Sequence, residues 1–265
     1  MKLIACDMDG TLLNNNHAIS QYNEDVIKKI NKDNKFVIAS GRPYTGIKNF
    51  IEQLDIASKG NYSITYNGSV VVENDTGKII FKKTIPGTCI KKAYSLSKKL
   101  GIGFLCYDEK GNYVFDGHDT EGTLLEKQII KPNVVISNFD KVDDEYIKLI
   151  FADTKENIDK VQSQIEEAFN DEFNVLRSHV CFLEIVSKQA NKGEALKFLE
   201  EYLHIDNKDT YAFGDNDNDY PMMAVAGHSY AMKNSPSKKL LNEFEICPSN
   251  EDNGVGKTLI DIFNL

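Results

Sequence analysis

The sequence has no long hydrophobic run, no closely spaced cysteine pair and no signal segment at its start. No stretch reaches the roughly 20 apolar residues that span a bilayer, and "MKLIACD" turns acidic too early for a signal peptide. The cysteines form no CxxC pair, which favours reduced, buried thiols; they are Cys6, Cys89, Cys106, Cys181 and Cys247. These absences argue against membrane and secreted proteins, and we expect a cytoplasmic location.

Clustered positive charge is also missing. The net charge is −9 at pH 7 over 265 residues, and no nucleic-acid partner is expected without clustered Lys and Arg. An acidic protein must bind phosphate through local donors or a metal ion, because its overall field repels anions. Repeats and low-complexity tracts are absent, whereas hydrophobic residues make up 41%. That fraction supplies a sizeable core for one large domain or two modest ones.

Strand and helix patterns alternate in the first part of the chain. The apolar run at residues 3–6 and the stretch "KFVIAS" are typical of buried strands. Helices are expected after Ser20, a plausible N-cap, and at Pro43. The stretch "YSITYNGSVVV" is expected to be one strand of a hairpin with "KIIFKKTI". The alternation returns at "NKGEALKFLEEYL", which predicts a parallel sheet with crossover helices.

The middle of the chain has a different pattern. The stretches "IGFLCYD" and "NYVFDG" are typical of strands around a turn, and "KENIDKVQSQIEEAF" is typical of a strong helix. The stretches "FNVLRSH" and "VCFLEIV" predict paired strands. We therefore predict an α/β fold with a Rossmann-like parallel-sheet core, residues 1–83 and 188–265. The inserted α+β domain, residues 84–187, is expected to contain an antiparallel sheet.

Four polar clusters fall at predicted strand ends or at a helix start. They are Asp7/Asp9, Ser40-Gly41-Arg42, Asn191-Lys192 and "GDNDND" at residues 214–219. Ligands of open α/β sheets bind beyond the carboxyl ends of the strands. The sheet is therefore expected to bring these distant clusters together.

The residue types in these clusters suit phosphoryl chemistry. The hard oxygen donors suited to Mg²⁺ are Asp7, Asp9 and Asp215. A divalent cation would remove the repulsion between neighbouring acids and let a phosphate approach. Ser40 and the backbone N–H of Gly41 can hold phosphate oxygens, and Lys192 supplies a positive charge.

The stretch "IACDMDGTLL", residues 4–13, places two acids side by side after a strand. Asp7 could attack phosphorus and form an aspartyl phosphate. Asp9 is placed to protonate the leaving alcohol and then to deprotonate the hydrolytic water. Most of the rate enhancement would come from positioning and charge neutralisation.

These motifs resemble the haloacid dehalogenase (HAD) superfamily of phosphatases, and more closely its Cof-type subfamily, which has a large inserted cap. The principal matches are "DMDGTLL" (7–13), "SGRP" (40–43), "NKGEAL" (191–196) and "GDNDNDYPMM" (214–223). Further matches are "YNGS" (66–69), "AMKNS" (231–235) and "NGVGKTLIDIF" (253–263). The resemblance covers both ends of the chain in order and is weak in the cap.

The resemblance implies a role for each matching residue. Asp7 would be the nucleophile and Asp9 the acid/base, and Mg²⁺ would be held by Asp7, the Asp9 carbonyl and Asp215. Phosphate would be held by Ser40, Gly41, Lys192 and Asn218. Asp219 would orient Lys192 or the water shell of the metal, and Arg42 and Asn67 are expected to support the site.

The function predicted in this way is a Mg²⁺-dependent phosphatase that acts through an aspartyl phosphate. Its partner would be a small phosphomonoester, such as a sugar phosphate or a related metabolite, and neither nucleic acid nor a membrane. Two alternatives stay open: a phosphomutase of the same superfamily, and a non-catalytic protein that binds metabolites on this scaffold. The sequence makes no prediction of oligomeric state.

Single motifs also have plainer interpretations. A calcium loop starting at Asp215 would need Gly and Glu where the chain has Tyr220 and Ala226. The stretch "GVGKT" lacks the earlier glycine of a phosphate-binding P-loop. Asn67 before Gly68 could be a simple turn. In the cap, Arg177 and His179 could meet a second group of the substrate, although a solvated strand face is the more ordinary interpretation.

Overall fold

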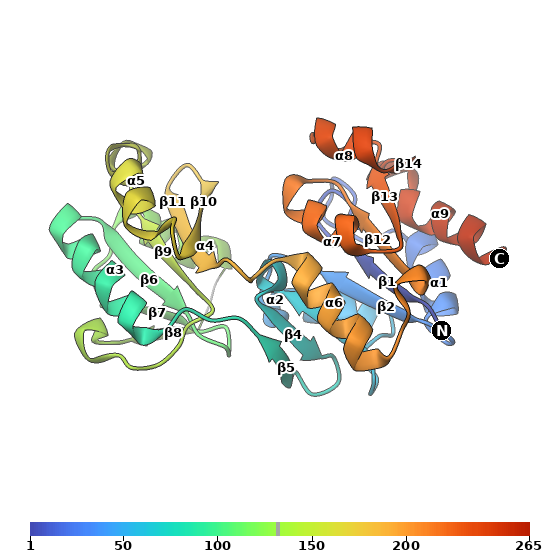
Figure 1. Cartoon of the computed structure of the whole chain (residues 1–265), viewed down its shortest axis with the longest axis horizontal. Helices are drawn as coiled ribbons and strands as arrows, with labels where there is room; N and C mark the ends of the chain where they lie inside the picture. The colour runs from blue at the N-terminus through green and yellow to red at the C-terminus, as the bar shows by residue number, and fades with distance from the viewer. Residues whose placement is uncertain (131–132) are drawn as a thin grey trace. The chain divides into compact units, whose positions relative to one another are not determined.

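The computed structural model describes residues 1–130 and 133–265, and the chain divides into two compact units. Unit 1 consists of Met1–Lys82 and Asn191–Leu265, and unit 2 of Lys83–Ala190. The expected insertion, residues 84–187, lies within unit 2. Each unit has its own sheet (Figure 1).

Unit 1 is built on a sheet with the strand order β14-β13-β12-β1-β2-β3-β4-β5. Neighbours from β14 to β3 are parallel, whereas β3–β4 and β4–β5 are antiparallel. The bounds are β1 (Leu3–Cys6), β2 (Lys35–Ala39), β3 (Tyr62–Thr65), β4 (Val70–Glu73), β5 (Ile79–Lys82), β12 (Thr210–Gly214), β13 (His228–Met232) and β14 (Glu245–Cys247).

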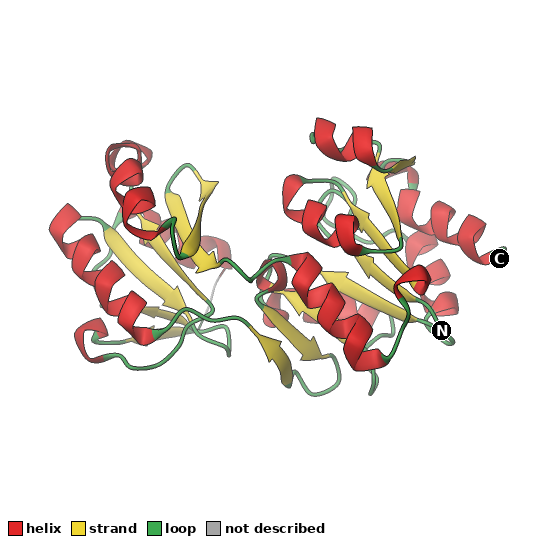
Figure 2. Ribbon diagram, viewed as in Figure 1, coloured by secondary structure: helices red, strands yellow, loops and turns green. Residues whose placement is uncertain are grey.

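Helices cover both faces of this sheet, as Figure 2 shows by the helices drawn on either side of its strands. One face packs on α1 (Gln21–Ile30), α2 (Tyr44–Gln53) and α9 (Gly254–Phe263). The other packs on α6 (Lys192–Leu203), α7 (Tyr220–Val225) and α8 (Lys238–Glu243). Strands β1 and β12 are buried along their whole length, and neither shows the polar alternation of a half-exposed strand. The predicted parallel-sheet core is confirmed.

The stretch expected as a single strand, "YSITYNGSVVV", is two strands, so that expectation is wrong. Strands β3 and β4 pair antiparallel, and the turn η1 (Tyr66–Gly68) lies between them. Tyr66, Asn67 and Gly68 all have positive φ, at 50°, 54° and 94°. Three consecutive residues with positive φ reverse the chain. The Asn-Gly pair is a turn signal, but the β-branched residues on both sides favoured a continuous strand in the sequence. The hairpin of β4 with β5 is confirmed.

Unit 2 has a sheet with the order β10-β11-β9-β6-β7-β8. Its strands are β6 (Gly103–Tyr107), β7 (Tyr113–Phe115), β8 (Val134–Ile136), β9 (Lys148–Ala152), β10 (Phe173–His179) and β11 (Phe182–Ser187). The expected antiparallel arrangement holds except between β7 and β8, which are parallel. The helix α4 (Glu121–Ile130) connects that pair, and a helical crossover returns the chain in the same direction. Helices α3 (Gly87–Leu100) and α5 (Lys155–Phe169) supply side chains to the apolar core of this unit.

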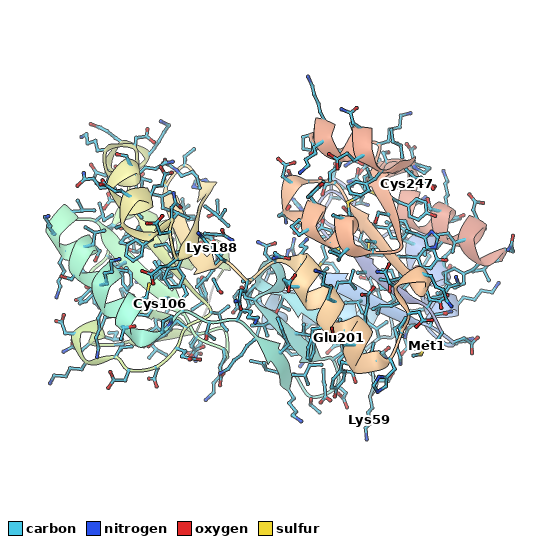
Figure 3. The ribbon with its side chains drawn as sticks, in the orientation of Figure 1. Met1, Lys59, Cys106, Lys188, Glu201 and Cys247 are labelled. Atoms are coloured by element: carbon cyan, nitrogen blue, oxygen red, sulfur yellow. The ribbon has the colours of Figure 1, made fainter. Side chains whose placement is uncertain are left out.

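The cysteines are free thiols, and all five are buried. Figure 3 labels Cys106 on β6 and Cys247 on β14. Throughout residues 1–130 and 133–265, no helix is both long and apolar enough to cross a membrane.

We predict that residues 83–190 fold as a domain of their own. The chain enters and leaves this unit at one place, since the Lys83 ammonium binds the side chain of Gln189 at 2.9 Å, and the unit has its own apolar core. The excised segment should unfold in urea in one cooperative step, followed by circular dichroism. Phe151→Ala, a buried core truncation, should lower its free energy of unfolding by about 3–5 kcal/mol. A broad transition, unaffected by that substitution, would contradict the prediction.

Candidate active site

Three of the predicted clusters meet because β12, β1 and β2 are neighbours in the sheet of unit 1. Asp7 follows β1, Ser40 follows β2 and Asp215 follows β12. The backbone N–H of Asp7 donates to the carbonyl of Phe213 at 3.0 Å, which continues the ladder between the two strands past their ends. Parallel strands therefore deliver all three side chains to one edge of the sheet.

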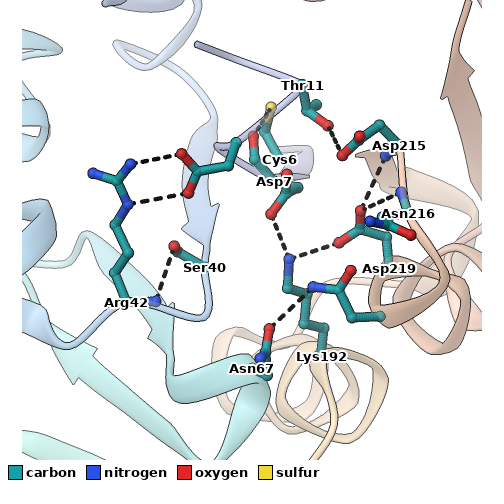
Figure 4. A network of polar contacts seen from close by, with 12 residues as sticks. Cys6, Asp7, Thr11, Ser40, Arg42, Asn67, Lys192, Asp215, Asn216 and Asp219 are labelled. Carbon is teal, nitrogen blue, oxygen red and sulfur yellow. Dashed lines mark hydrogen bonds and ion pairs between the residues drawn. The ribbon is translucent and has the colours of Figure 1, made fainter. Parts of the chain in front are cut away.

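The side chain of Lys192 lies at the centre of this edge (Figure 4). Lys192 is the first residue of α6 and is completely buried. Its ammonium donates to Asp7 Oδ1 at 2.5 Å and to Asp219 Oδ1 at 2.6 Å. A buried ammonium needs such partners, because an unpaired charge in the interior is very costly. The fourth predicted cluster thus joins the first.

Asp219 is fixed by more than the lysine. Its second oxygen, Oδ2, accepts hydrogen bonds from the backbone N–H groups of Asp215, at 3.0 Å, and Asn216, at 3.1 Å. These bonds close the turn η4 (Asp217–Asp219) over the end of β12. Asp219 therefore orients Lys192 from a rigid turn.

Three carboxylates gather around the lysine. One oxygen from each of Asp7, Asp215 and Asp219 lies within 4.8 Å of the others. Thr11 donates its hydroxyl to Asp215 Oδ1 at 3.3 Å. Gly10 has a φ of +84°, and a Cβ there would lie 2.4 Å from Asp215 Oδ2. The site therefore requires glycine at position 10, for conformation and for space.

Burial and mutual repulsion perturb the acids. Burial, together with the charge of Asp219, raises the pKa of Asp7 to about 7, and Lys192 offsets only part of that effect. Burial and Asp219 also raise the pKa of Asp215 to about 6. Burial lowers the pKa of Lys192, but the neighbouring charges of Asp219 and Asp7 raise this pKa well above its usual value. The lysine stays charged while the acids compete for its single positive charge.

The charge balance of the cluster fits a divalent cation. When ionised, the three carboxylates carry three negative charges against one positive charge on Lys192, which leaves an excess of two. Carboxylate oxygens are the donors that hard divalent cations take, with backbone carbonyls and water. Such an ion would lower the pKa values that burial and repulsion have raised.

Asp9 lies apart from this cluster, although only one residue separates it from Asp7. Its half-exposed carboxylate forms a two-pronged pair with Arg42, with Nε to Oδ2 at 3.0 Å and Nη2 to Oδ1 at 2.6 Å. Among the described residues, the three-acid group does not include its side chain. The two neighbouring acids thus pair with different cations, Asp7 with Lys192 and Asp9 with Arg42.

The turn after β2 lies next to Asn67, whose side chain in turn contacts Asn218. The Ser40 hydroxyl accepts the backbone N–H of Arg42 at 3.1 Å, and the Ser40 carbonyl accepts that of Asn67 at 3.0 Å. Asn218 Nδ2 donates to Asn67 Oδ1 at 3.1 Å. A Cβ on Gly41 would lie 3.0 Å from Asn67 Nδ2. Ser40, Gly41, Asn67 and Asn218 are therefore neighbours in one connected group.

Several supporting residues have no clear signal in the sequence. Asn234 donates its amide to the Gly10 carbonyl at 2.8 Å, and the hydroxyl of Ser235 donates to the Asp215 carbonyl. Both lie in the matched stretch "AMKNS", yet the motif gave no indication of what its side chains contact. Thr11 lies in the first motif and was likewise not assigned a role.

The two cap residues considered from sequence lie in the β10–β11 hairpin. Arg177 donates to Asp159 Oδ1 at 2.9 Å and to Gln162 Oε1 at 2.6 Å on α5. Its Nε also donates to the carbonyl of His179 at 2.9 Å. Arg177 therefore braces the hairpin against a helix of its own unit, which is a structural role.

Replacing Lys192 tests whether it stabilises the cluster. Lys192→Met should lower the free energy of unfolding at pH 8 by about 3–5 kcal/mol, because two buried carboxylates lose their cation. The loss should shrink as pH falls toward 6. The folded-state pKa of Asp7 lies above its ordinary value of 3.8, so folding takes up a proton in this range.

Urea denaturation of the two proteins at several pH values provides the measurement. Lys197→Met is the matched control, since Lys197 lies on the same helix, is exposed and pairs with Glu194 at 3.2 Å. Its effect should stay below about 0.5 kcal/mol. Equal losses in both variants, or a loss from Lys192→Met that does not vary with pH, would contradict the role of the buried pair.

Known proteins place the chain in a family. Residues 4–259 match the family described as haloacid dehalogenase-like hydrolase. A Streptococcus pyogenes protein named "Putative phosphatase" is 31% identical over 265 residues, covering 98% of this chain and 97% of its own. A Bacillus subtilis protein named 5-amino-6-(5-phospho-D-ribitylamino)uracil phosphatase is 29% identical over 286 residues, covering 96% of each chain. The crystal structure of a haloacid dehalogenase-like hydrolase from Bacteroides thetaiotaomicron superposes with a TM-score of 0.87 at 25% identity and covers 99% of both chains. The fold, the acidic cluster and these matches agree: the chain belongs to the haloacid dehalogenase-like hydrolases.

Proposed function

We propose that this hydrolase is a Mg²⁺-dependent phosphatase that cleaves small phosphomonoesters through an aspartyl phosphate on Asp7. The observation that carries the proposal is the arrangement of the two acids. Asp7 lies buried against Lys192 in a group with excess negative charge, while Asp9 lies beside it in a separate pair with Arg42. This arrangement supports different roles for the two carboxylates, with Asp7 in the proposed site for metal and phosphate and the Asp9 side chain in its own pair with Arg42.

Asp7 is the nucleophile in this proposal. Lys192 binds Oδ1, and Oδ2 attacks phosphorus. The new Oδ2–P bond forms as the P–O bond to the substrate alcohol breaks, so that Asp7 carries the phosphoryl group. Water then attacks the phosphorus, the Oδ2–P bond breaks, and inorganic phosphate leaves with Asp7 restored.

Asp9 is the acid/base. It gives a proton to the departing alkoxide in the first half-reaction and takes one from the attacking water in the second. Arg42 holds both oxygens of this carboxylate, so it acts as a positioning residue. Protonation of this carboxylate weakens its pair with the guanidinium, because a neutral carboxyl group is a poorer acceptor than a carboxylate.

The residues that would hold Mg²⁺ are Asp7, the Asp9 carbonyl and Asp215. When bound, the ion would neutralise negative charge on the phosphoryl group and on the carboxylates. Asp219 is occupied by Lys192 and by two backbone N–H groups, so it orients the lysine.

The phosphate donors in this proposal lie around the end of β2 and the start of α6. Ser40 supplies its hydroxyl, Gly41 its backbone N–H, Lys192 its ammonium and Asn218 its amide. Gly41 is exposed, so its backbone N–H can reach a phosphate oxygen. Ser40 is buried beside it, which holds the Ser40 side chain in place. Together they neutralise and orient the transferred group.

The substrate class is a sugar phosphate or a related phosphorylated metabolite. The named activity of the Bacillus subtilis relative, on a phosphorylated ribityl compound, supports this class. Unit 2 is proposed to act as a cap that selects the alcohol. The five unpaired, buried thiols favour a reducing compartment, and we propose a cytoplasmic location.

Phosphate release from a panel of metabolite monophosphates tests the function. The native protein should release phosphate with Mg²⁺ and lose that activity in EDTA. Asp7→Asn should reduce release by at least about 10³-fold, because the amide is no nucleophile and the covalent route is lost. Its thermal midpoint serves as the control that the variant is folded.

Other outcomes would point to the alternatives. Interconversion of phosphate isomers without free phosphate would replace the phosphatase by a phosphomutase. Binding of the same compounds without turnover would replace it by a metabolite-binding protein. Either result would overturn the proposed reaction while leaving the family unchanged.

Leaving-group dependence tests the roles of Asp9 and Arg42. In single-turnover experiments, which report the first half-reaction alone, Asp9→Asn should slow release of the alcohol from an alkyl phosphate by about 10²–10⁴-fold, because the alkoxide needs a proton to leave. The loss on p-nitrophenyl phosphate should be much smaller in the same experiment, since nitrophenolate leaves unprotonated. Arg42→Met should show the same selectivity with a smaller loss. Asp7→Asn, as the control, should lose both substrates alike, and a loss in Asp9→Asn that does not depend on the leaving group would refute its role as the acid.

A further inference from the structure

The turn η1 combines an unusual backbone with contacts to the site. Tyr66 and Asn67 have φ of 50° and 54°, and Gly68 has 94°. Left-handed φ is uncommon for side-chain-bearing residues and is rare for a bulky one such as Tyr66. Strained backbone of this kind persists where the surrounding structure holds it, and it is concentrated at functional sites.

The surroundings that hold this turn belong to the site. The N–H of Tyr66 donates to the Arg42 carbonyl at 3.2 Å, and the N–H of Asn67 donates to the Ser40 carbonyl at 3.0 Å. On the other side, a Cβ on Gly68 would lie 2.1 Å from the Asn191 carbonyl carbon and 2.6 Å from the backbone nitrogen of Lys192. The turn is therefore wedged between the Ser40–Arg42 segment and the first residue of α6.

In this position of the turn, the side-chain amide of Asn67 lies next to two proposed phosphate ligands, Gly41 and Asn218. Asn67 Oδ1 accepts from Asn218 Nδ2 at 3.1 Å, as Figure 4 shows beside the labelled Asn67. Asn67 Nδ2 lies 3.0 Å from the position of a Cβ on Gly41. Among the described residues, the hydrogen bonds of Asn67 leave this Nδ2 without an acceptor. The half-buried amide of Asn67 thus lies beside Asn218 and against Gly41, where Nδ2 and Oδ1 are 3.0 and 3.2 Å from the position of a Cβ.

We propose that Asn67 is a further phosphate ligand, donating from Nδ2 to an oxygen of the transferring phosphoryl group. A simple turn residue would explain the left-handed backbone, since Asn tolerates it. It would not explain an amide that accepts from Asn218 on one side and faces Gly41 on the other. The inference rests on the proposed function for its ligand and goes beyond it in assigning a fifth donor.

Two substitutions separate direct donation from support of Asn218. Asn67→Asp keeps the acceptor for Asn218 and tolerates left-handed φ, but it replaces the donor by a negative charge. Asn67→Gly tolerates the backbone and removes both the donor and the acceptor. Direct donation predicts that Asp is the worse replacement, because it repels phosphate. A role only in fixing Asn218 predicts that Gly is the worse one.

Binding of inorganic phosphate with Mg²⁺, measured by calorimetry, gives the readout. Asn67→Gly should raise the Kd by about 10-fold or more, the range of a hydrogen bond to a charged group, and Asn67→Asp should raise it further. The control is Asn264→Asp, the same charge change at another left-handed asparagine, φ 51°, at the end of α9. It should stay within twofold of the native protein, and thermal midpoints confirm that each variant is folded.

The outcomes separate this inference from the proposed function. A Kd for Asn67→Asp within twofold of the native value, or a greater loss in Asn67→Gly, would overturn the inference. Absence of phosphate binding by the native protein would overturn it together with the proposed phosphate site. Ranked binding as expected, without release of phosphate from any monoester, would leave Asn67 a phosphate ligand and reject the phosphatase.

Discussion

The contact between Lys192 and the two carboxylates of Asp7 and Asp219 is the constraint around which the site of this protein is organised. A completely buried ammonium must be paired, and its two partners come from opposite ends of the chain. Asp7 follows the first strand and Asp219 closes the turn after β12, so the pairing requires β1 and β12 to be adjacent. The chemistry and the sheet order thus depend on each other.

Glycines provide the space that this pairing needs. Gly10 lets the chain turn against Asp215, and Gly68 lets the η1 turn approach the backbone at the start of α6. Both have left-handed φ, so a side chain would add backbone strain to steric conflict. The close approach of separate backbone segments explains how side chains from four parts of unit 1 reach one small volume.

Two acids separated by one residue end in different environments. Asp7 enters the buried group with Lys192, while Asp9 turns to Arg42 and stays half exposed. Burial and charge raise the pKa of Asp7 to about 7, which makes an added cation favourable there. Such a division suits a reaction in which one carboxylate must be a nucleophile near a metal and the other must exchange protons with solvent.

Local sequence predicted most of the elements and the motifs that hold the candidate site residues, because apolar runs and motif spacing are properties of neighbouring positions. The runs at 3–6 and 35–39 became strands, and the motifs at Asp7, Ser40, Lys192 and Asp215 lie together as the strand-end argument required. Only the tertiary structure decided which groups pair: Arg42 with Asp9, Asn67 with Asn218, and Asn234 with the carbonyl of Gly10. Those choices depend on the register of distant strands and on left-handed turns such as Tyr66–Gly68, and neither is encoded in the periodicity of a short segment.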